Sequence, residues 1–188
     1  MLKRILEQKN LTCYWLAKHC SLPYSTISDI CNDITPLNKC RAEVVYKIAQ
    51  ALNMSMEDLV EPYITKRIDF DLFKSNVCHA LKSLGDIQFL LSTLESDEIR
   101  KLANWEWYPE SLYLLAMTDY ISRLNGIPAC NRYDDLRRCR LQNTVYPASV
   151  LALAKVSNNQ DIKAQAVKNS IPEFIKFNIV ESEIRNVI

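Results

Sequence analysis

Scarcity of glycine constrains this chain more than any other feature, because only two glycines occur in 188 residues, Gly85 and Gly126. Tight β-hairpins and phosphate-binding loops both depend on glycine, so the sequence disfavours hairpin-rich β architecture and a nucleotide-binding loop. Apolar residues make up 48% of the chain, which is enough for a packed core in one domain or in two small ones. The sequence therefore predicts an all-α protein.

The hydrophobic pattern divides the chain into two parts. Apolar positions recur at helical spacing in five short segments, the fifth ending near Val60, and the pattern resumes at Phe70. Between them the stretch "EPYITKR" contains a proline and three charged residues. We therefore predict a five-helix domain over residues 1–62, a linker over residues 63–69 and a second α-helical domain over residues 70–188.

The strongest helical pattern of the second part begins at Pro109 and stops before Gly126. Its apolar residues cover about 200° of a helical wheel, so other helices must enclose it. We predict that it is the central helix of the second domain. Shorter helices are expected over residues 134–141, 147–155, 161–169 and 172–177.

The stretch "SLPYSTISDICND" predicts a short helix with one polar and one apolar side. Ile27 and Ile30 lie nearly opposite a polar face about 140° wide, and no Lys or Glu occurs between Ser21 and Cys31. Short hydrogen-bonding side chains on a protruding helix suit the major groove of DNA, whereas the alternative is an ordinary solvated face. The residues of this polar face are Tyr24, Ser25, Ser28, Asp29 and Asn32.

Residues 1 to about 62 resemble the Xre/lambda-repressor-like helix-turn-helix family. The resemblance rests on "LTCYWLAKHCSLPYSTISDI" and, further on, "VVYKIAQALNMSMEDL". It implies that the polar face reads base pairs of double-stranded DNA and that Thr12, Cys13, Lys39 and Arg41 meet phosphates. Two residues depart from the family pattern: Ser21 stands where glycine is usual in the turn, and Cys13 where glutamine is common.

Charge limits how tightly the first domain can bind DNA by itself. Residues 1–62 contain seven Lys or Arg and seven Asp or Glu, so their formal charges cancel. Neutralisation of phosphates supplies much of DNA affinity, and exposed Lys or Arg residues are by default only solvated surface. Lys9 and Lys18 are further cations that can meet the backbone. We therefore expect a homodimer, with its interface in residues 110–124 or 105–108.

No stretch of the sequence predicts an active site, a metal site or a cofactor site. None of the seven cysteines forms a C-x-x-C pair, and Cys78 and His79, as neighbours on a helix, point about 100° apart. Asp134 and Asp135 are also adjacent, with no histidine at a useful spacing, so they do not make a catalytic pair. We expect that the chain is not an enzyme.

Arginines cluster in the stretch "RYDDLRRCR", at Arg132, Arg137, Arg138 and Arg140. Such a charge run is usually a solvated face with local ion pairs, and the alternative is a patch that docks phosphate or a partner.

Aromatic residues mark two more segments. Tyr14 and Trp15 belong either to a surface that another domain or subunit covers or to the edge of the core. Trp105, Trp107 and Tyr108 are expected in the core of the second domain.

The sequence predicts a cytoplasmic protein with reduced thiols. Its N-terminal residues lack the apolar segment of a secretion signal, and the longest apolar run, residues 112–117, is too short to cross a bilayer. The leading hypothesis is a dimeric, sequence-specific DNA-binding repressor. The alternative is an antitoxin-like interaction module, because residues 70–188 resemble extensions found behind Xre-type domains in Firmicute-like proteins, some of which mask a toxin.

Overall fold

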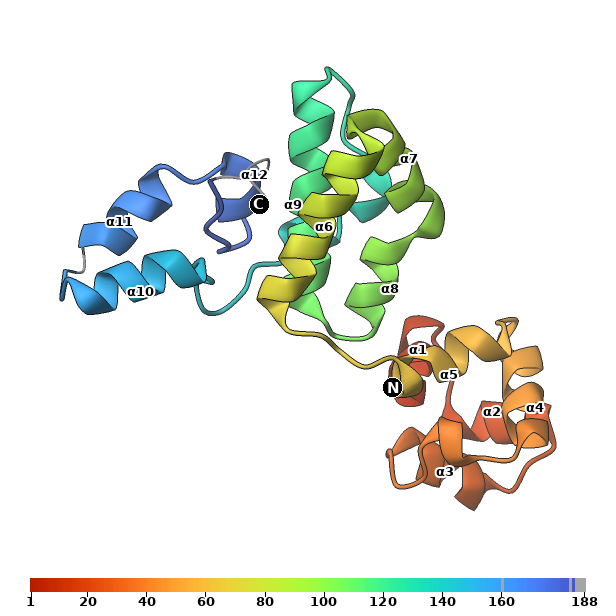
Figure 1. Cartoon of the computed structure of the whole chain (residues 1–188). Helices are drawn as coiled ribbons and strands as arrows, with labels where there is room; N and C mark the ends of the chain where they lie inside the picture. Colours follow the sequence, from red (N-terminus) through yellow and green to blue (C-terminus); the bar gives the residue numbers. More distant parts are fainter. Residues whose placement is uncertain (160, 183, 185–188) are drawn as a thin grey trace. The chain divides into compact units, whose positions relative to one another are not determined.

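The structure, a computed structural model, describes residues 1–159, 161–182 and 184. These residues form twelve α-helices and three 3₁₀ turns, and they contain no β-strand beyond one isolated bridge (Figure 1). The chain separates into two compact units, Met1–Arg67 and Ile68–Ile188, each with its own hydrophobic core. The predicted all-α class is confirmed.

The first unit is a cluster of five short α-helices and one 3₁₀ turn. Its fully buried residues include Leu16 on the second helix, Ile27 and Ile30 on the third, and Ile48 on the fourth. The second helix packs on both the third and the fourth, so it forms the centre of the unit. The elements are α1 (Leu2–Gln8), α2 (Cys13–Cys20), α3 (Tyr24–Cys31), η1 (Leu37–Lys39), α4 (Ala42–Leu52) and α5 (Met56–Ile64).

The fifth helix is longer than the sequence pattern predicts. It runs past Val60 and includes Pro62, and it ends at Ile64, so the non-helical connection covers Thr65–Asp69 rather than residues 63–69. The reason is tertiary: the Tyr63 hydroxyl donates to Asp33 Oδ1 at 3.3 Å, and Asn38 Nδ2 donates to the Tyr63 carbonyl at 3.4 Å. These contacts hold the last turn of α5 against the loop after α3, although proline disfavours a helix interior.

The second unit holds the remaining helices and two 3₁₀ turns. Its helices are α6 (Phe70–Leu84), α7 (Asp86–Ser96), α8 (Glu98–Asn104), α9 (Tyr108–Leu124), α10 (Ala148–Val156), α11 (Asp161–Lys168) and α12 (Pro172–Ile175). The turns are η2 (Asn131–Tyr133) and η3 (Leu136–Arg138).

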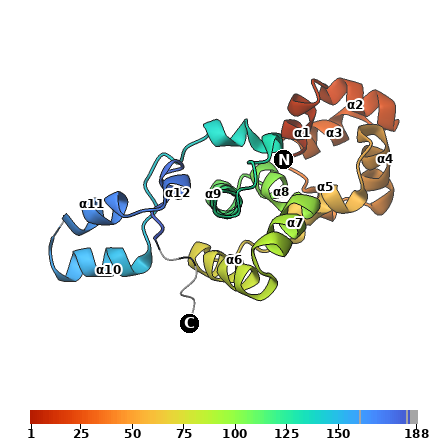
Figure 2. The same cartoon turned by 90° about the horizontal axis from the view of Figure 1, so that it is seen from above.

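Helix α9 is the central helix of the second unit, as predicted. It packs against α6, α7, α8 and α12, and Figure 2 views it end-on among them. All residues from Glu110 to Thr118 are buried, as are Ile121 and Ser122. The expectation that residues 110–124 form a dimer interface is therefore wrong for most of this helix, because the unit's own core already covers it.

The helix predicted over residues 134–141 does not form. The chain makes the turns η2 and η3 there, which bury Tyr133 and Leu136. Arg137 turns inward, where its guanidinium donates to both carboxylate oxygens of Asp119 on α9, at 2.7 and 2.9 Å. The same side chain also donates to Asp134 at 2.7 Å and to the Cys130 carbonyl at 2.8 Å. This four-bond anchor, rather than local helix propensity, fixes the segment.

Helices α10 and α11 form a hairpin that packs mainly on itself (Figure 1). Only Ala154 of α10 is buried, and α11 buries no residue. Leu151, Leu153 and Val156 are exposed, Val156 to 87%. The hairpin therefore presents apolar side chains to solvent, in contrast to α9.

None of the described helices is both long and apolar enough to span a membrane.

Candidate nucleic-acid interface

Helix α2 begins at a side-chain cap. Thr12 has extended backbone geometry, and its Oγ1 accepts a hydrogen bond from the Trp15 N–H at 3.1 Å. The hydroxyl of an exposed threonine in this role keeps its own hydrogen for another acceptor. A phosphate oxygen approaching the start of α2 would meet that hydroxyl together with the positive end of the helix dipole.

A tight turn connects α2 to α3. Ser21 adopts the left-handed conformation, with φ 52° and ψ 42°, and its N–H bonds to the carbonyls of Ala17 and Lys18. Leu22 N–H then bonds back to the Ala17 carbonyl at 3.1 Å. Serine thus takes the geometry that glycine usually provides, at a cost of about 1–2 kcal/mol that the packed core offsets.

Helix α3 is anchored on one side and bare on the other. Ile27 and Ile30 are fully buried, whereas Tyr24 is 56% exposed and Ser25 is exposed as well. Pro23, the N-cap of α3, has the non-helical backbone angles φ −57° and ψ 140°, so the helix begins at Tyr24. The side chains of Tyr24 and Ser25, in the first turn of α3, are therefore accessible to a bound ligand.

The other three predicted base-reading residues lie further along the same helix. Ser28 and Asp29 are half-buried, and Asn32 is exposed at the C-cap. Asn32 Nδ2 donates to Ser28 Oγ at 3.3 Å, so these two side chains support one another. The accessible polar surface is consequently concentrated at Tyr24 and Ser25, with Asn32 at the far end.

Lys39 and Arg41 lie just before helix α4. Lys39 is the last residue of η1, Arg41 is the N-cap of α4, and both are exposed. Neither makes an ion pair within the described part of the chain. They add full positive charges to the positive end of the α4 dipole.

Some of the charged residues in residues 1–62, whose formal charges cancel, are engaged within the protein. Lys47 is paired at 2.6 Å with Glu43, which lies in the first turn of α4. Asp33 accepts a hydrogen bond from Tyr63, and burial, more than the charge of Asp33, raises the pKa of Tyr63 to about 12. The Tyr63 hydroxyl therefore stays protonated at physiological pH, and the hydrogen bond that it donates stabilises the charged carboxylate of Asp33.

The two aromatic residues at the start of α2 behave differently. Trp15 is half-buried and stacks on His19, with 3.8 Å between ring centroids, so it belongs to the edge of the core. Tyr14 is 69% exposed, two residues after Thr12. Its phenol is a further hydrogen-bond donor beside the α2 N-terminus that the sequence interpretation did not assign to DNA. The two adjacent aromatic residues in the sequence, Tyr14 and Trp15, were the feature that could have pointed to this donor.

The buried cysteines of the first unit are packed into its hydrophobic core. Cys20 and Cys31 are buried, and all seven cysteines of the chain are free. Burial, reinforced by the neighbouring Cys13, raises the pKa of Cys31 to about 12, and burial also raises the pKa of Cys20. Protonated thiols are poor nucleophiles and poor metal ligands. No group of three metal-ligating side chains occurs among the described residues.

The arginine-rich segment of the second unit is largely committed to structure. Arg137 binds Asp119 and Asp134, Arg132 pairs with Asp97 at 3.6 Å, and Arg140 donates to Asn178. Asp135 accepts two hydrogen bonds from Arg100, at 2.6 and 2.8 Å, which lower the pKa of this carboxyl group. The expected local pairs are present, and contacts to distant segments add to them.

Residues 1–63 match the family model described as the Cro/C1-type HTH DNA-binding domain. Together with the buried Ile27 and Ile30 and the left-handed Ser21, this match identifies the N-terminal unit as a helix-turn-helix domain of that type. The predicted resemblance to Xre-like regulators is confirmed for this segment. The comparisons with curated proteins and with solved structures give no significant match.

Proposed function

We propose that this chain is a sequence-specific, DNA-binding transcription repressor that acts as a homodimer in the cytoplasm. The observation that carries the proposal is helix α3, which buries Ile27 and Ile30 and leaves Tyr24 and Ser25 bare in a Cro/C1-type domain. In helix-turn-helix proteins the N-terminal residues of the second helix contact base edges in the major groove. We further propose that the chain has no catalytic activity of its own.

Base reading follows from the chemistry of the α3 side chains. Serine and tyrosine hydroxyls both donate and accept, and Asn32 presents a donor and an acceptor that match the major-groove edge of adenine. Asp29 accepts only, so it suits the amino group of cytosine and repels phosphate. The helix therefore discriminates among base pairs while contributing no charge attraction.

Backbone contacts orient the domain on the duplex. Thr12 offers its hydroxyl at the start of α2, and Lys39 and Arg41 offer charges at the start of α4. Helix N-termini and basic side chains are the usual partners of phosphate oxygens. These contacts fix the register in which α3 meets the bases.

We infer a dimer because a single helix-turn-helix domain of this chain attracts DNA only weakly by its charge. Specific binders reach about 10⁻⁸ to 10⁻¹¹ M, and a domain with zero formal charge makes few of the phosphate contacts that support such affinity. Two helix-turn-helix domains joined in a dimer add their contacts on a palindromic DNA site.

The α10–α11 hairpin offers the surface for that dimer, in place of α9. A two-fold axis brings the same patch of two copies together, so the exposed apolar Leu153 and Val156, three positions apart on one face of α10, would cover their own counterparts. A dimer bound across its own promoter would exclude other proteins from that DNA, which is why we assign repression.

The test measures binding of the full chain to its own promoter and to random DNA at one fixed salt concentration. Replacing Tyr24 and Ser25 together by alanine should weaken promoter binding, by about 1–3 kcal/mol for each lost base contact, and leave random DNA nearly unaffected. Tyr46→Ala is the matched control, because Tyr46 is 54% exposed on α4 and belongs to neither set of contacts. Equal loss on both DNAs would remove the base-reading role.

The Lys39→Ala variant tests the phosphate contacts separately from the base contacts. It should weaken binding to promoter and random DNA alike and reduce the slope of log affinity against log salt by about one unit. Lys101→Ala in the second unit should leave the slope unchanged.

A second candidate function is an antitoxin-like module that binds a partner protein. The exposed apolar side chains of α10 favour it, because a partner of another sequence can cover them as well as a second copy can. The mass of the purified full chain in solution distinguishes the two: a homodimer supports the repressor, and a monomer supports the partner-binding module.

A further inference from the structure

A cavity lies within the second unit. It has a volume of about 480 Å³ and is lined by α6, α7, the first residue of α8 and the middle of α9. Ligand sites in proteins usually measure about 300–1,000 Å³ and are mostly apolar with a few polar groups. The cavity falls within that range.

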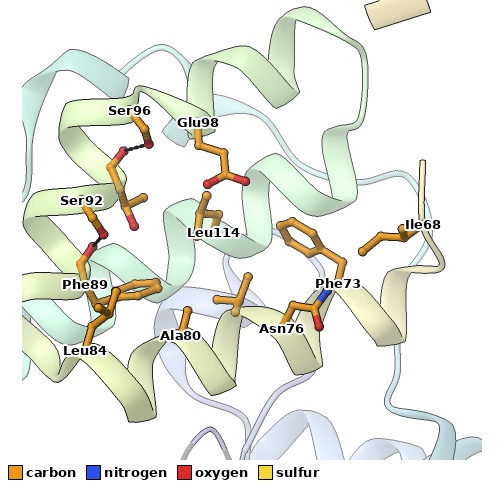
Figure 3. Close-up of a pocket in the computed structure, with 12 residues that line it drawn as sticks. Ile68, Phe73, Asn76, Ala80, Leu84, Phe89, Ser92, Ser96, Glu98 and Leu114 are labelled. Carbon is orange, nitrogen blue, oxygen red and sulfur yellow. Dashed lines mark hydrogen bonds between the residues drawn. The ribbon is translucent and has the colours of Figure 1, made fainter. Parts of the chain in front are cut away.

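Aromatic and aliphatic side chains make most of its wall. Figure 3 shows Phe73 and Ala80 from α6, Phe89 from α7 and Leu114 from α9 facing the same space. Phe73, Phe89 and Leu114 are each less than one-tenth exposed, so the wall is part of the packed core and is preformed. A ligand with an apolar body can bind here without reorganising the unit.

A single charged group interrupts this apolar wall. Glu98 is the only ionisable residue of the lining, and its carboxylate is drawn pointing toward Leu114 and Phe73 (Figure 3). The side chain is exposed to solvent, and no hydrogen bond or ion pair engages it among the described residues. Desolvation by the surrounding protein raises the pKa of this carboxyl group, and Lys101 opposes the shift only partially.

Two serine hydroxyls of the wall act as acceptors, and Asn76 adds an amide that can both donate and accept. Ser92 Oγ donates to the Phe89 carbonyl at 3.1 Å, and Ser96 Oγ donates to the Thr93 carbonyl at 3.2 Å. Because both hydroxyl hydrogens are used within α7, the oxygen lone pairs remain as acceptors. Since Glu98 is the one charged group of the lining and the two hydroxyls accept, the site favours a cation with N–H groups over a carboxylate or phosphate ligand, which the Glu98 charge repels.

The geometry points to a binding site for a small organic ammonium ion with an apolar body, held between α6, α7 and α9 with its charge on Glu98. Binding replaces water at the Glu98 carboxylate by a charge-assisted hydrogen bond, which is stronger than a neutral one. The site lies within one unit and needs no DNA, so it goes beyond the proposed repressor function and stands independently of it.

The test titrates the full chain, without DNA, with three probes that share one aromatic body. Phenethylamine carries a positive charge, phenethyl alcohol none and phenylacetate a negative charge. Calorimetry or NMR shift titration should rank their affinities in that order, with the amine about tenfold tighter than the alcohol. Phenylacetate should bind most weakly of the three.

Substitutions test whether Glu98 is the side chain that gives the preference for the positively charged probe. Glu98→Gln should lower the affinity for phenethylamine to that for phenethyl alcohol and leave the alcohol unaffected. Glu95→Gln, an exposed carboxylate on α7 outside the lining, should change neither. Ala80→Phe should weaken both probes by filling the cavity, and because Glu98→Gln alters no packing, its result stands even where Ala80→Phe perturbs the fold.

Three outcomes would overturn the assignment. Equal affinities for amine and alcohol in the wild type would mean that Glu98 does not select charge. An amine preference that survives in Glu98→Gln would place the cation elsewhere. Failure of all three probes to bind at millimolar concentration, with a change of oligomeric mass in Glu98→Gln, would show that a second copy occupies the cavity.

Discussion

Helices α3 and α9 use the same hydrophobic periodicity for opposite purposes. Helix α3 buries three of its eight residues and leaves its polar side uncovered, whereas α9 buries eleven of its seventeen, polar residues included. The difference is that α9 is enclosed by its own unit, whereas α3 keeps a polar side that is accessible to solvent. Helix α10 is a third case, because it is apolar and yet buries only Ala154.

Removing side-chain volume from α9 should produce the largest effect on stability. Leu115 is fully buried, so Leu115→Ala should destabilise the second unit by about 2–5 kcal/mol. Leu153→Ala on α10, where the side chain is 57% exposed, should change the stability of the isolated monomer by less than about 0.5 kcal/mol. Urea unfolding followed by circular dichroism measures both, and equal effects would contradict the distinction between enclosed and bare helices.

Making α10 polar should have the next largest effect, on assembly and DNA affinity rather than on fold. The double variant Leu153→Asn, Val156→Asn should be monomeric by light scattering and bind the promoter at least about a hundredfold more weakly, because the effective concentration of the second DNA-binding domain is lost. Leu72→Asn on α6, which is 52% exposed, is the matched control and should remain dimeric. A dimer that persists in the double variant would exclude the hairpin as the interface.

The smallest effect is expected where α9 binds α12. Arg123 donates two hydrogen bonds to Glu173, at 2.5 and 3.2 Å, and these lower the pKa of the Glu173 carboxyl group. A lowered folded-state pKa contributes stability above the unfolded-state value of about 4.3 and loses that contribution as pH falls through the folded-state value.

The corresponding measurement compares melting temperatures at two pH values. Arg123→Gln should melt below the wild type at pH about 7, and the gap should narrow as the pH falls through the lowered folded-state pKa of Glu173, because the protonated carboxyl group no longer pairs with the guanidinium. Arg138→Gln, an exposed arginine outside this pair, should show no such pH dependence. A gap that is the same at both pH values would assign the effect to packing instead.

The sequence predicts well those features that depend on local spacing. Ile27 and Ile30 lie three apart, which fixes the buried side of α3 and, with it, the side that faces solvent. The same reasoning identified α9 as the enclosed helix. In both cases the residues that decide the outcome belong to the same helix, so no knowledge of distant contacts is needed.

Features that depend on distant partners could not be predicted in this way. The segment around Arg137 was expected to be helical, but its conformation is set by Asp119, eighteen positions earlier in the chain. Likewise Pro62 suggested that α5 ends early, whereas Tyr63 is held by Asp33 from the loop after α3. At the candidate interface the exposure of Tyr14 was undecided, because only the packing of Trp15 on His19 separates the two aromatics.

The measurement that tests the central claim most directly is a hydroxyl-radical footprint of the full chain on its own promoter. The account predicts two symmetric protected half-sites about one helical turn apart, since two α3 helices enter successive major grooves on one face of the duplex. The Tyr24→Ala, Ser25→Ala variant should lose this pattern at concentrations where it still binds random DNA. A single protected half-site, or an unchanged footprint in that variant, would contradict the claim that paired α3 helices read the sequence.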